Sequence, residues 1–553
     1  MITVQFTIND QTIQKTYESK IRVVDILSQE NHIDMTQIHS CLVNNYYERL
    51  DYMITESCKV SLFDIRDHYA NMAMQSGLTL LYIKAVHDIL GKDVRVVIAN
   101  SLSKGLFTKI HHGNVSDEDV MKISKRMKEL VKLDLPIHEK TLNRKEILAY
   151  LQKKERKEEL NLYRSAPDLQ QAYLCELGGE EDLMYNHLDL STKSLSLFEL
   201  KKYRNGVLLR FPHPQCMNEV PVYQEQKLLY DAFSTETQWE KLLGVNYAYQ
   251  LNRCVENNTY QDLIQLSEAL HEKKIGEIAD EISAKKKRII LISGPSSSGK
   301  TSFAKRLCVQ LRVNGLQPLY LGTDDYFVNR KDVPFEKDGK QDFEGLGAVD
   351  TKLFEQQMNE LLAGKKVNIP RYDFIKGEKV FGERIMSIES NQPIVIEGIH
   401  ALNPELTKGI PDENKFKIYI SPLTQINLDP HHRVPTTDAR MLRRMVRDYR
   451  TRGNSAASTI HDWTSVREGE EKNIFPYNNQ ADVFFNSQCI YELAVLKKYA
   501  EPLLKGIHEE QPEYSEAQRM LQFLAFFVSI QDDSSIANHS LLREFVGGSI
   551  LVK

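Results

Sequence analysis

The sequence IILISGPSSSGKTSFAKRL, from Ile289 to Leu307, joins an apolar segment, a turn rich in glycine and serine, and the start of a helical pattern. Its centre, GPSSSGKT, fits the pattern GxxxxGK[ST] in the strand-loop-helix context typical of a phosphate-binding loop. Such a loop binds phosphate because backbone N–H groups turn inward and the helix adds its positive end. The alternative is a Ser/Gly-rich turn that matches by chance, which the flanking strand and helix make rare. We therefore predict a nucleotide site.

The roles within this loop follow from residue type. Lys300 is predicted to reach the β and γ phosphates of ATP, and the Thr301 hydroxyl is predicted to bind Mg²⁺. The predicted nucleotide contacts are Gly294, Pro295, Ser296, Ser297, Ser298, Gly299, Lys300, Thr301 and Ser302.

Short apolar segments recur after this point and alternate with helical patterns. They are Ile289–Ser293, Pro318–Leu321, Pro393–Ile396 and Lys417–Ile420. Strands that alternate with helices predict an α/β fold with a parallel sheet.

Acidic residues follow two of these strands. Asp324 and Asp325 come after the second strand, and Glu397 comes directly after the third. Open α/β sheets bind ligands at the carboxyl ends of their strands, and transfer of a phosphoryl group to a hydroxyl needs a carboxylate to accept the proton. The alternatives are a helix N-cap for Asp324 or Asp325 and a solvated strand end for Glu397.

Four arginines, Arg440, Arg443, Arg444 and Arg447, recur at spacings of three and four residues. At least three of them would share one helix face, and guanidinium groups on one face suit a charged transition state. The alternative is a solvated basic helix paired with acids. Together with the phosphate loop, the run favours an arginine-bearing lid.

Composition and length indicate the number of domains, the kinds of partner and the location of the protein. The chain has 553 residues and a net charge of −5, so several domains are expected and overall charge does not favour a nucleic acid or membrane partner. The seven cysteines form no CxxC pair, and no apolar run reaches the roughly 20 residues of a membrane span. We expect a cytoplasmic protein with no membrane association.

The sequence divides into four predicted domains. Residues 1–63 and 64–222 read as two α+β units, 223–287 as a helical connector almost free of glycine and proline, and 288–553 as the phosphate-loop domain. The apolar segment Met520–Val528 and the tail LLREFVGGSILV would form either a contact between subunits of a homo-oligomer or part of the core.

Several motifs of the second half together resemble the uridine kinase and phosphoribulokinase family of P-loop kinases. They are GPSSSGKT, TDDYF, PRYDF, IVIEGIHAL, DARMLRRMVRDYRTRG and NNQADVFFN. The resemblance covers roughly 286–550 and implies a kinase that uses ATP and Mg²⁺.

The resemblance also implies roles for individual residues. Asp324 would be the general base that holds the sugar, and Glu397 the acid near Mg²⁺. Tyr372 would contact the base of the acceptor. Arg444 and Arg447 would face acceptor and phosphate, and Arg452 would close over the transferred group from a lid.

One departure concerns the choice of acceptor. Uridine-cytidine kinases carry a histidine shortly after the YDF segment, whereas this chain continues with Lys376, Gly377 and Glu378. A missing donor relaxes or changes the choice of base, because a buried site discriminates by leaving polar groups unpaired.

The first half carries its own resemblances. Residues 1–63 resemble a TGS β-grasp domain, and 64–222 resemble the second, editing-type domain of threonyl-tRNA synthetases, through RDHYANMAMQSGL, SDEDVMKISKRMKELV and DLMYNHLDL. His68 and His187 match two positions of the editing site, while Met72 and Met184 stand at the other two, so we expect editing chemistry to be absent. With the segment WTSVREGEEKNIFPY and the tail LREFVGGS, the chain resembles a longer bacterial group of uridine kinase-like nucleoside kinases.

The first functional hypothesis is a kinase that phosphorylates the 5′-hydroxyl of a nucleoside, with a uridine or cytidine type as first choice. The second is a kinase for another ribosyl metabolite or a sugar phosphate. The third is an ATP-switched regulator whose first half binds RNA or a small molecule, with His68 and His187 as one candidate site.

Overall fold

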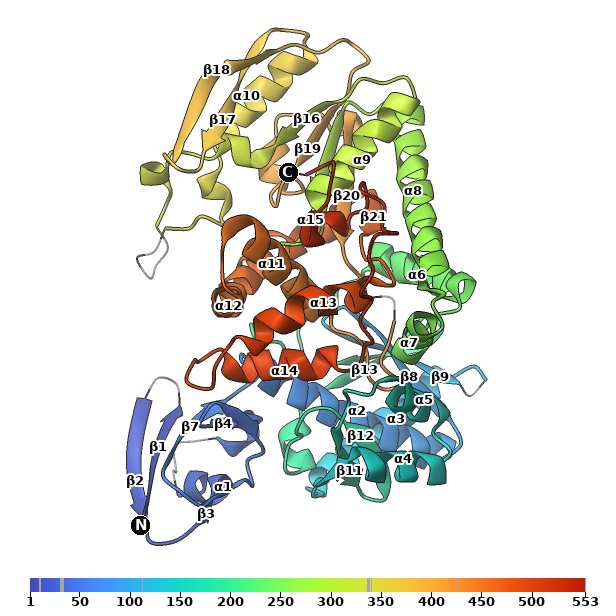
Figure 1. Cartoon of the computed structure of the whole chain (residues 1–553), viewed down its shortest axis with the longest axis vertical. Coiled ribbons are helices and arrows are strands. Elements are labelled where there is room, and N and C mark those ends of the chain that lie inside the picture. Colours follow the sequence, from blue (N-terminus) through green and yellow to red (C-terminus); the bar gives the residue numbers. More distant parts are fainter. Residues whose placement is uncertain are drawn as a thin grey trace.

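The computed structural model describes residues 1–8, 11–29, 34–111, 113–335, 339, 341–424 and 426–552. The chain is elongated, with its N-terminal strands at one end and the phosphate-loop sheet toward the other (Figure 1). In the described part of the chain, no helix is long and apolar enough to cross a membrane.

The sheet of the second half is parallel, as predicted. Its order is β16 (Leu319–Gly322), β19 (Ile394–Glu397), β15 (Ile289–Ser293), β20 (Lys415–Ser421) and β21 (Val483–Asn486). Every neighbouring pair is parallel, so all five carboxyl ends lie at one edge. β21 was not among the strands predicted from the apolar segments, since its sequence VFFN is short and follows a polar stretch.

Helices cover both faces of this sheet. One face packs on α8 (Tyr260–Ala284) and α9 (Lys300–Val313) through residues such as Ile278 and Phe303. The other face packs on α10 (Thr351–Leu362) through Phe354. The hairpin of β17 (Val367–Asp373) and β18 (Glu378–Met386) extends beside α10 (Figure 1).

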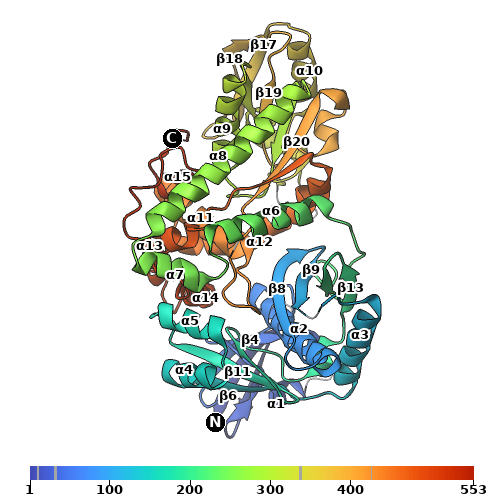
Figure 2. The same cartoon turned by 90° about the vertical axis from the view of Figure 1, so that its right-hand side faces the viewer.

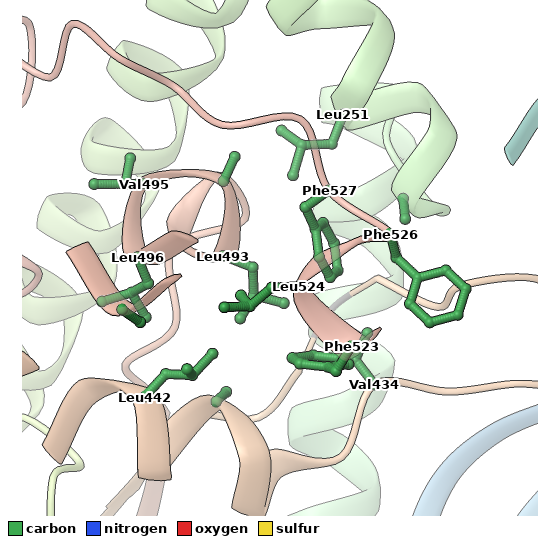
Figure 3. Packing of buried hydrophobic residues seen from close by; sticks show 14 of the residues in the cluster. Leu251, Val434, Leu442, Leu493, Val495, Leu496, Phe523, Leu524, Phe526 and Phe527 are labelled. Carbon is green, nitrogen blue, oxygen red and sulfur yellow. The ribbon is translucent and has the colours of Figure 1, made fainter. Parts of the chain in front are cut away.

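The C-terminal helices build the largest core. These elements are α11 (Thr436–Arg452), α12 (Ala456–Asn473), α13 (Glu492–Lys505), α14 (Tyr514–Leu524) and α15 (Arg543–Val546). Leu442, Leu493, Leu496, Phe523 and Phe527 pack together in this core (Figure 3). The core also takes in Met520, Leu524 and Phe526, so most apolar side chains of the 520–528 segment serve intramolecular packing.

The N-terminal unit is β-rich. Its main sheet has the order β2 (Gln11–Tyr17), β1 (Ile2–Ile8), β7 (Cys58–Phe63), β4 (Ser40–Val43) and β5 (Tyr46–Glu48). A short pair, β3 (Ile21–Arg22) and β6 (Met53–Ile54), and the helix α1 (Val23–Leu27) complete it. β1 runs parallel to β7, and the core between sheet and helix contains Phe6, Ile26 and Val60.

The next unit is α+β and is built around the buried helix α2 (His68–Leu90), whose N-terminus is capped by the Asp67 carboxylate. The helix α3 (Asp117–Lys132) begins at a capping box between Ser116 and Asp119, as the sequence SDED predicts. The remaining elements are β8 (Arg95–Leu102), β9 (Gly105–His111), β10 (His138–Asn143), α4 (Arg144–Lys153), α5 (Lys157–Ser165), β11 (Gln171–Leu177), β12 (Glu180–Met184), β13 (Glu199–Tyr203) and β14 (Gly206–Arg210).

Helices connect this unit to the parallel sheet. They are α6 (Lys227–Leu243), α7 (Ala248–Glu256) and the long α8, which runs up beside α9 (Figure 2). The core cluster of the C-terminal helices also takes in Leu151 and Leu162 of α4 and α5 and Leu251 of α7. One apolar core therefore joins the first half to the second.

Candidate active site

The phosphate loop takes its shape from two glycines. A Cβ at Gly294 would lie 2.0 Å from the carbonyl oxygen of Ile420, so no other residue fits against β20 without moving the backbone. Gly299 has a φ of 82°, in the left-handed region, where it turns the chain into α9. The loop thus ends with backbone N–H groups at the start of a helix, the arrangement that binds phosphate.

Lys300 and Thr301 follow at the helix start. The Lys300 ammonium donates to the carbonyl oxygens of Gly294 (2.9 Å) and Pro295 (3.2 Å), which holds it across the loop. Burial lowers the pKa of Lys300, and the nearby Glu397 carboxylate opposes that change. Thr301 donates its hydroxyl to Glu397 Oε1 at 2.9 Å. A hydroxyl and a carboxylate oxygen this close are the hard donors that Mg²⁺ prefers.

Glu397 is therefore not a solvated strand end. Besides Thr301, the Tyr320 hydroxyl donates to Glu397 Oε1 at 3.1 Å. Burial raises the pKa of Glu397, and the Asp324 carboxylate adds to the rise while Lys300 reduces it. The two acids face one another because Gly322, at the end of β16, pairs in register with Glu397 on β19.

Asp324 and Asp325 have different environments. Both lie in the 3₁₀ turn Thr323–Tyr326, whose N-cap is Gly322, so neither is the predicted alternative of a cap. Asp325 forms an ion pair with Arg384 of β18 at 2.6 Å. Asp324 has no ion pair within 4 Å among the residues described, and its side chain reaches solvent. Asp324 is thus the carboxylate free to meet an acceptor.

The surrounding protein shifts the pKa of Asp324. Although Asp324 keeps an exposed side chain, the protein packed around its carboxyl disfavours the charged form and raises its pKa; Lys300 reduces that rise, and the carboxylates of Asp325 and Glu344 add to it. A carboxylate with a raised pKa accepts a proton more readily than an ordinary one.

Two arginines of α11 support the loop from behind. Arg440 donates to the Ser296 carbonyl at 3.0 Å and pairs with Glu470. Arg443 donates to the Ser297 carbonyl at 3.3 Å and pairs with Glu492. Both side chains are buried, so these two hold loop carbonyls and do not face a substrate. Glu470 also accepts from the backbone N–H of Ser296 at 2.9 Å.

The other arginines of α11 gather on one acid. Arg447 donates to Asp448 Oδ1 at 2.7 Å, and Arg444 and Arg452 each lie 3.5 Å from Oδ2 of the same carboxylate. Arg444 also donates to the Ser296 hydroxyl at 3.0 Å, which ties the group to the phosphate loop. Three cations around one buried carboxylate leave net positive charge.

Arg452 is the most accessible of the three, with 56% of its side chain exposed. Its pKa is lowered by burial of the guanidinium and by repulsion from Arg447 and Arg444, while the Asp448 carboxylate opposes the change. An exposed arginine at the end of α11 can approach an incoming anion.

Tyr372 lies on β17 and is 9% exposed. Its ring meets Phe327 edge-on at 5.6 Å and Phe374 at 5.1 Å between centroids. The 374–377 turn beyond it joins β17 to β18 and carries no histidine.

Sequence reasoning missed several members of the site. Asp448 stands four residues after Arg444 and four before Arg452, so helical spacing alone would have revealed it. Glu470, Tyr320 and Glu344 carry no such signal, because each reaches the site through the fold.

The two histidines of the first half have different partners. His68 Nε2 lies 3.4 Å from Asp438 in the first turn of α11, whereas His187 Nδ1 lies 2.7 Å from Glu139 Oε1. The Asp438 carboxylate also pairs with Arg519 at 2.7 Å. Across the described ranges, no three His, Cys, Asp or Glu residues are grouped to hold a metal ion.

A loop of the second half covers the 182–185 segment of the first. His431 lies 2.6 Å from Asp182, and the Tyr185 hydroxyl donates to Asp429 at 2.8 Å. His432 Nε2 lies 3.4 Å from the sulfur of Met184. This loop directly precedes α11, so the first half contacts the helix that carries the arginines at its base.

The parallel sheet, its phosphate loop and the acids at the same edge place the second half in the class of P-loop kinases. Residues 289–493 match the Phosphoribulokinase / Uridine kinase family. A uridine kinase from Ligilactobacillus salivarius is 30% identical over 214 residues, 38% of this chain and 91% of that protein. One from Macrococcus caseolyticus is 31% identical over 199 residues, 36% of this chain and 87% of that protein.

The chain therefore belongs to the phosphoribulokinase and uridine kinase family, and its second half is a phosphotransferase. Among solved structures, a possible uridine kinase from Bacillus stearothermophilus is 20% identical with a TM-score of 0.27, over 39% of this chain and 98% of that one. The relatives match the kinase part of the chain only.

Proposed function

We propose that this protein transfers the γ-phosphoryl group of ATP to the 5′-hydroxyl of a nucleoside, with a uridine or cytidine type as first choice. The observation that carries the proposal is Asp324, a carboxylate with a raised pKa and no ion pair within 4 Å among the described residues, beside the Lys300 ammonium. The uridine kinases that match at about 30% identity support a nucleoside as acceptor.

The chain's own residues divide the work. The loop N–H groups and Lys300 hold the triphosphate, and Asp324 accepts the proton of the attacking hydroxyl. Arg444, Arg447 and Arg452 stabilise the charge that spreads over the transferring group. Thr301 and Glu397 would hold Mg²⁺, which would supply positive charge to the phosphate groups when bound.

Tyr372 is proposed to contact the acceptor. Its aromatic edge contacts with Phe327 and Phe374 give an apolar wall near Asp324, of the kind that a planar nucleobase packs against. A sugar phosphate is the second candidate acceptor, because the arginine group around Asp448 keeps net positive charge and the turn at 374–377 has no histidine.

The first half is proposed to comprise the domains 1–63 and 64–222, of TGS-like and synthetase editing-like type, joined by the connector 223–287 to the kinase domain 288–553. A separate core at residues 2–62 supports the first boundary. The second unit has a core of its own between Ile65 and Phe211, but its helices α4 and α5 pack into the core of the C-terminal helices. RNA or a small molecule remains the proposed ligand of the first half. Titration of RNAs and amino acids, with turnover as the readout, tests it: no binding and unchanged turnover would refute it.

A substrate panel tests the main proposal. The purified chain is incubated with ATP, Mg²⁺ and each common ribo- and deoxyribonucleoside or ribose phosphate, and ADP release is measured with Lys300→Ala as the blank. Turnover confined to nucleosides is the expected result. Turnover only with sugar phosphates would favour the second acceptor, and tight ATP binding without any turnover would favour an ATP-switched regulator.

A further inference from the structure

The C-terminal tail returns to the start of α9. Leu541 is fully buried, and its Cδ2 lies 4.0 Å from the Cβ position of Gly299 in the phosphate loop. Lys305 of α9 donates to the carbonyl oxygen of Leu551 at 2.5 Å. The two cartoon views agree that α15 lies beside α9 (Figure 1, Figure 2). The tail therefore packs against the helix whose N-terminus forms the phosphate site.

One side chain of this tail occupies donors of that site. Glu544 Oε2 accepts from the backbone N–H of Ser302 at 3.2 Å and from the Ser302 hydroxyl at 2.6 Å. Ser302 is the third residue of α9, so its N–H has no acceptor within the helix. Glu544 is only 8% exposed.

The charge of Glu544 is not balanced in the same way as that of the other buried acids near the loop. Glu470 and Glu492 pair with Arg440 and Arg443, respectively. Within the described residues, no cation lies within 4 Å of the Glu544 carboxylate. A buried carboxylate whose direct bonds go to a helix N-terminus occupies the position of an anion.

Phosphate and carboxylate compete for the same donors. N–H groups at the start of the helix after a phosphate loop cradle the α and β phosphates of a nucleotide. The Ser302 N–H cannot serve Glu544 and a phosphate oxygen at once, and the two anions repel each other.

We propose that Glu544 is a built-in competitor of the nucleotide, so that ATP binds only when the Glu544 carboxylate leaves the donors of Ser302. The inference rests on the proposed use of ATP. It makes the Glu544 side chain an autoinhibitory contact at the phosphate site.

The backbone around Glu544 is held in place. Gly547 and Gly548 follow with φ values of 100° and 79°, which supply a turn that other residues adopt only with strain. Arg450 of α11 donates to the carbonyl oxygens of Glu544 (3.0 Å) and Phe545 (3.4 Å). Because Phe545 is also fully buried, the movement that frees Ser302 is one of the Glu544 side chain.

Binding of the magnesium complex of the non-hydrolysable analogue AMP-PNP to the full chain tests the proposal, measured by isothermal titration calorimetry. Glu544→Gln keeps an acceptor for Ser302 and removes the charge, whereas Glu544→Ala removes the contact. Glu510→Gln, at an exposed carboxylate, is the matched control. We expect both Glu544 variants to bind about tenfold tighter, because a like charge next to the phosphate is lost, and the control to be unchanged.

Hydrogen exchange of the 541–548 amides gives a second readout. In the wild-type chain, AMP-PNP should speed exchange there, since the Glu544 side chain loses its bonds to Ser302 and no longer anchors this segment. Equal or weaker binding by both Glu544 variants, with these amides equally protected in the presence of nucleotide, would overturn the competition and leave Glu544 as a helix cap. Failure of the wild type and of every variant to bind AMP-PNP would instead remove the proposed kinase function.

Discussion

Replacing Asp324 by Asn tests the proposed base directly. Asn keeps the size of the side chain and its contact with the turn, but it cannot accept the proton of the acceptor hydroxyl. General base catalysis is worth about 10²- to 10⁴-fold, which corresponds to about 2.7–5.4 kcal/mol of activation free energy. We expect kcat to fall by this factor. ATP should bind at least as tightly, because a negative charge near Lys300 and the phosphates is removed.

The neighbouring Asp325 is the matched control. Asp325→Asn breaks the ion pair with Arg384. The Asp325 side chain is 23% exposed and the Arg384 side chain 28%. Partly exposed pairs contribute about 0–1 kcal/mol, so kcat/KM should fall by about fivefold or less. The two substitutions change the charge equally and differ only in which carboxylate is lost.

Steady-state ADP release against pH measures both effects. Burial raises the pKa of Asp324, so the protonated and inactive form persists to higher pH than for an ordinary aspartate. Activity of the wild type should therefore rise with pH through that raised pKa, and Asp324→Asn should lose this acidic limb. The reasoning would be refuted if Asp324→Asn kept the wild-type kcat, or if it lost activity while keeping the same acidic limb.

Two further substitutions test the contacts that support the phosphate loop. Glu492→Gln leaves the fully buried Arg443 without its ionic partner, so the free energy of unfolding should fall by about 3–5 kcal/mol. Urea unfolding followed by circular dichroism measures this change, and a fall below about 1 kcal/mol would contradict the role of Glu492. Gly294→Ala places a Cβ 2.0 Å from the carbonyl oxygen of Ile420 and should abolish AMP-PNP binding in calorimetry. Gly276→Ala in α8, where the nearest atom is 3.7 Å away, should bind normally, and equal binding by the two variants would show that the loop tolerates the clash.

The parallel sheet could be predicted from sequence because its strands are short apolar runs, each followed by a helical pattern. Ile289–Ser293 was predicted to the residue, whereas the third strand, predicted as Pro393–Ile396, runs from Ile394 to Glu397. β21 was missed because VFFN directly follows the polar stretch NNQAD and does not stand out as an apolar segment.

The site was predictable where local spacing carries the information. The phosphate loop and the arginines of α11 follow from their motifs, but the sequence does not show which arginines are buried. Arg443 turns inward because Glu492 of α13 meets it, and that partner lies 49 residues away. Glu544 could not be anticipated for the same reason, as 242 residues separate it from Ser302.

The contacts at the base of α11 make the kinase half dependent on the first half. His68 reaches Asp438, and the Tyr185 hydroxyl bonds to the carboxylate of Asp429, so polar groups of the kinase half depend on partners in the first half. A kinase cut from its neighbours would carry these buried carboxylates into water beside an apolar surface made for α4 and α5. Transplanting the first half onto a shorter kinase of this family would therefore require rebuilding this face of the kinase.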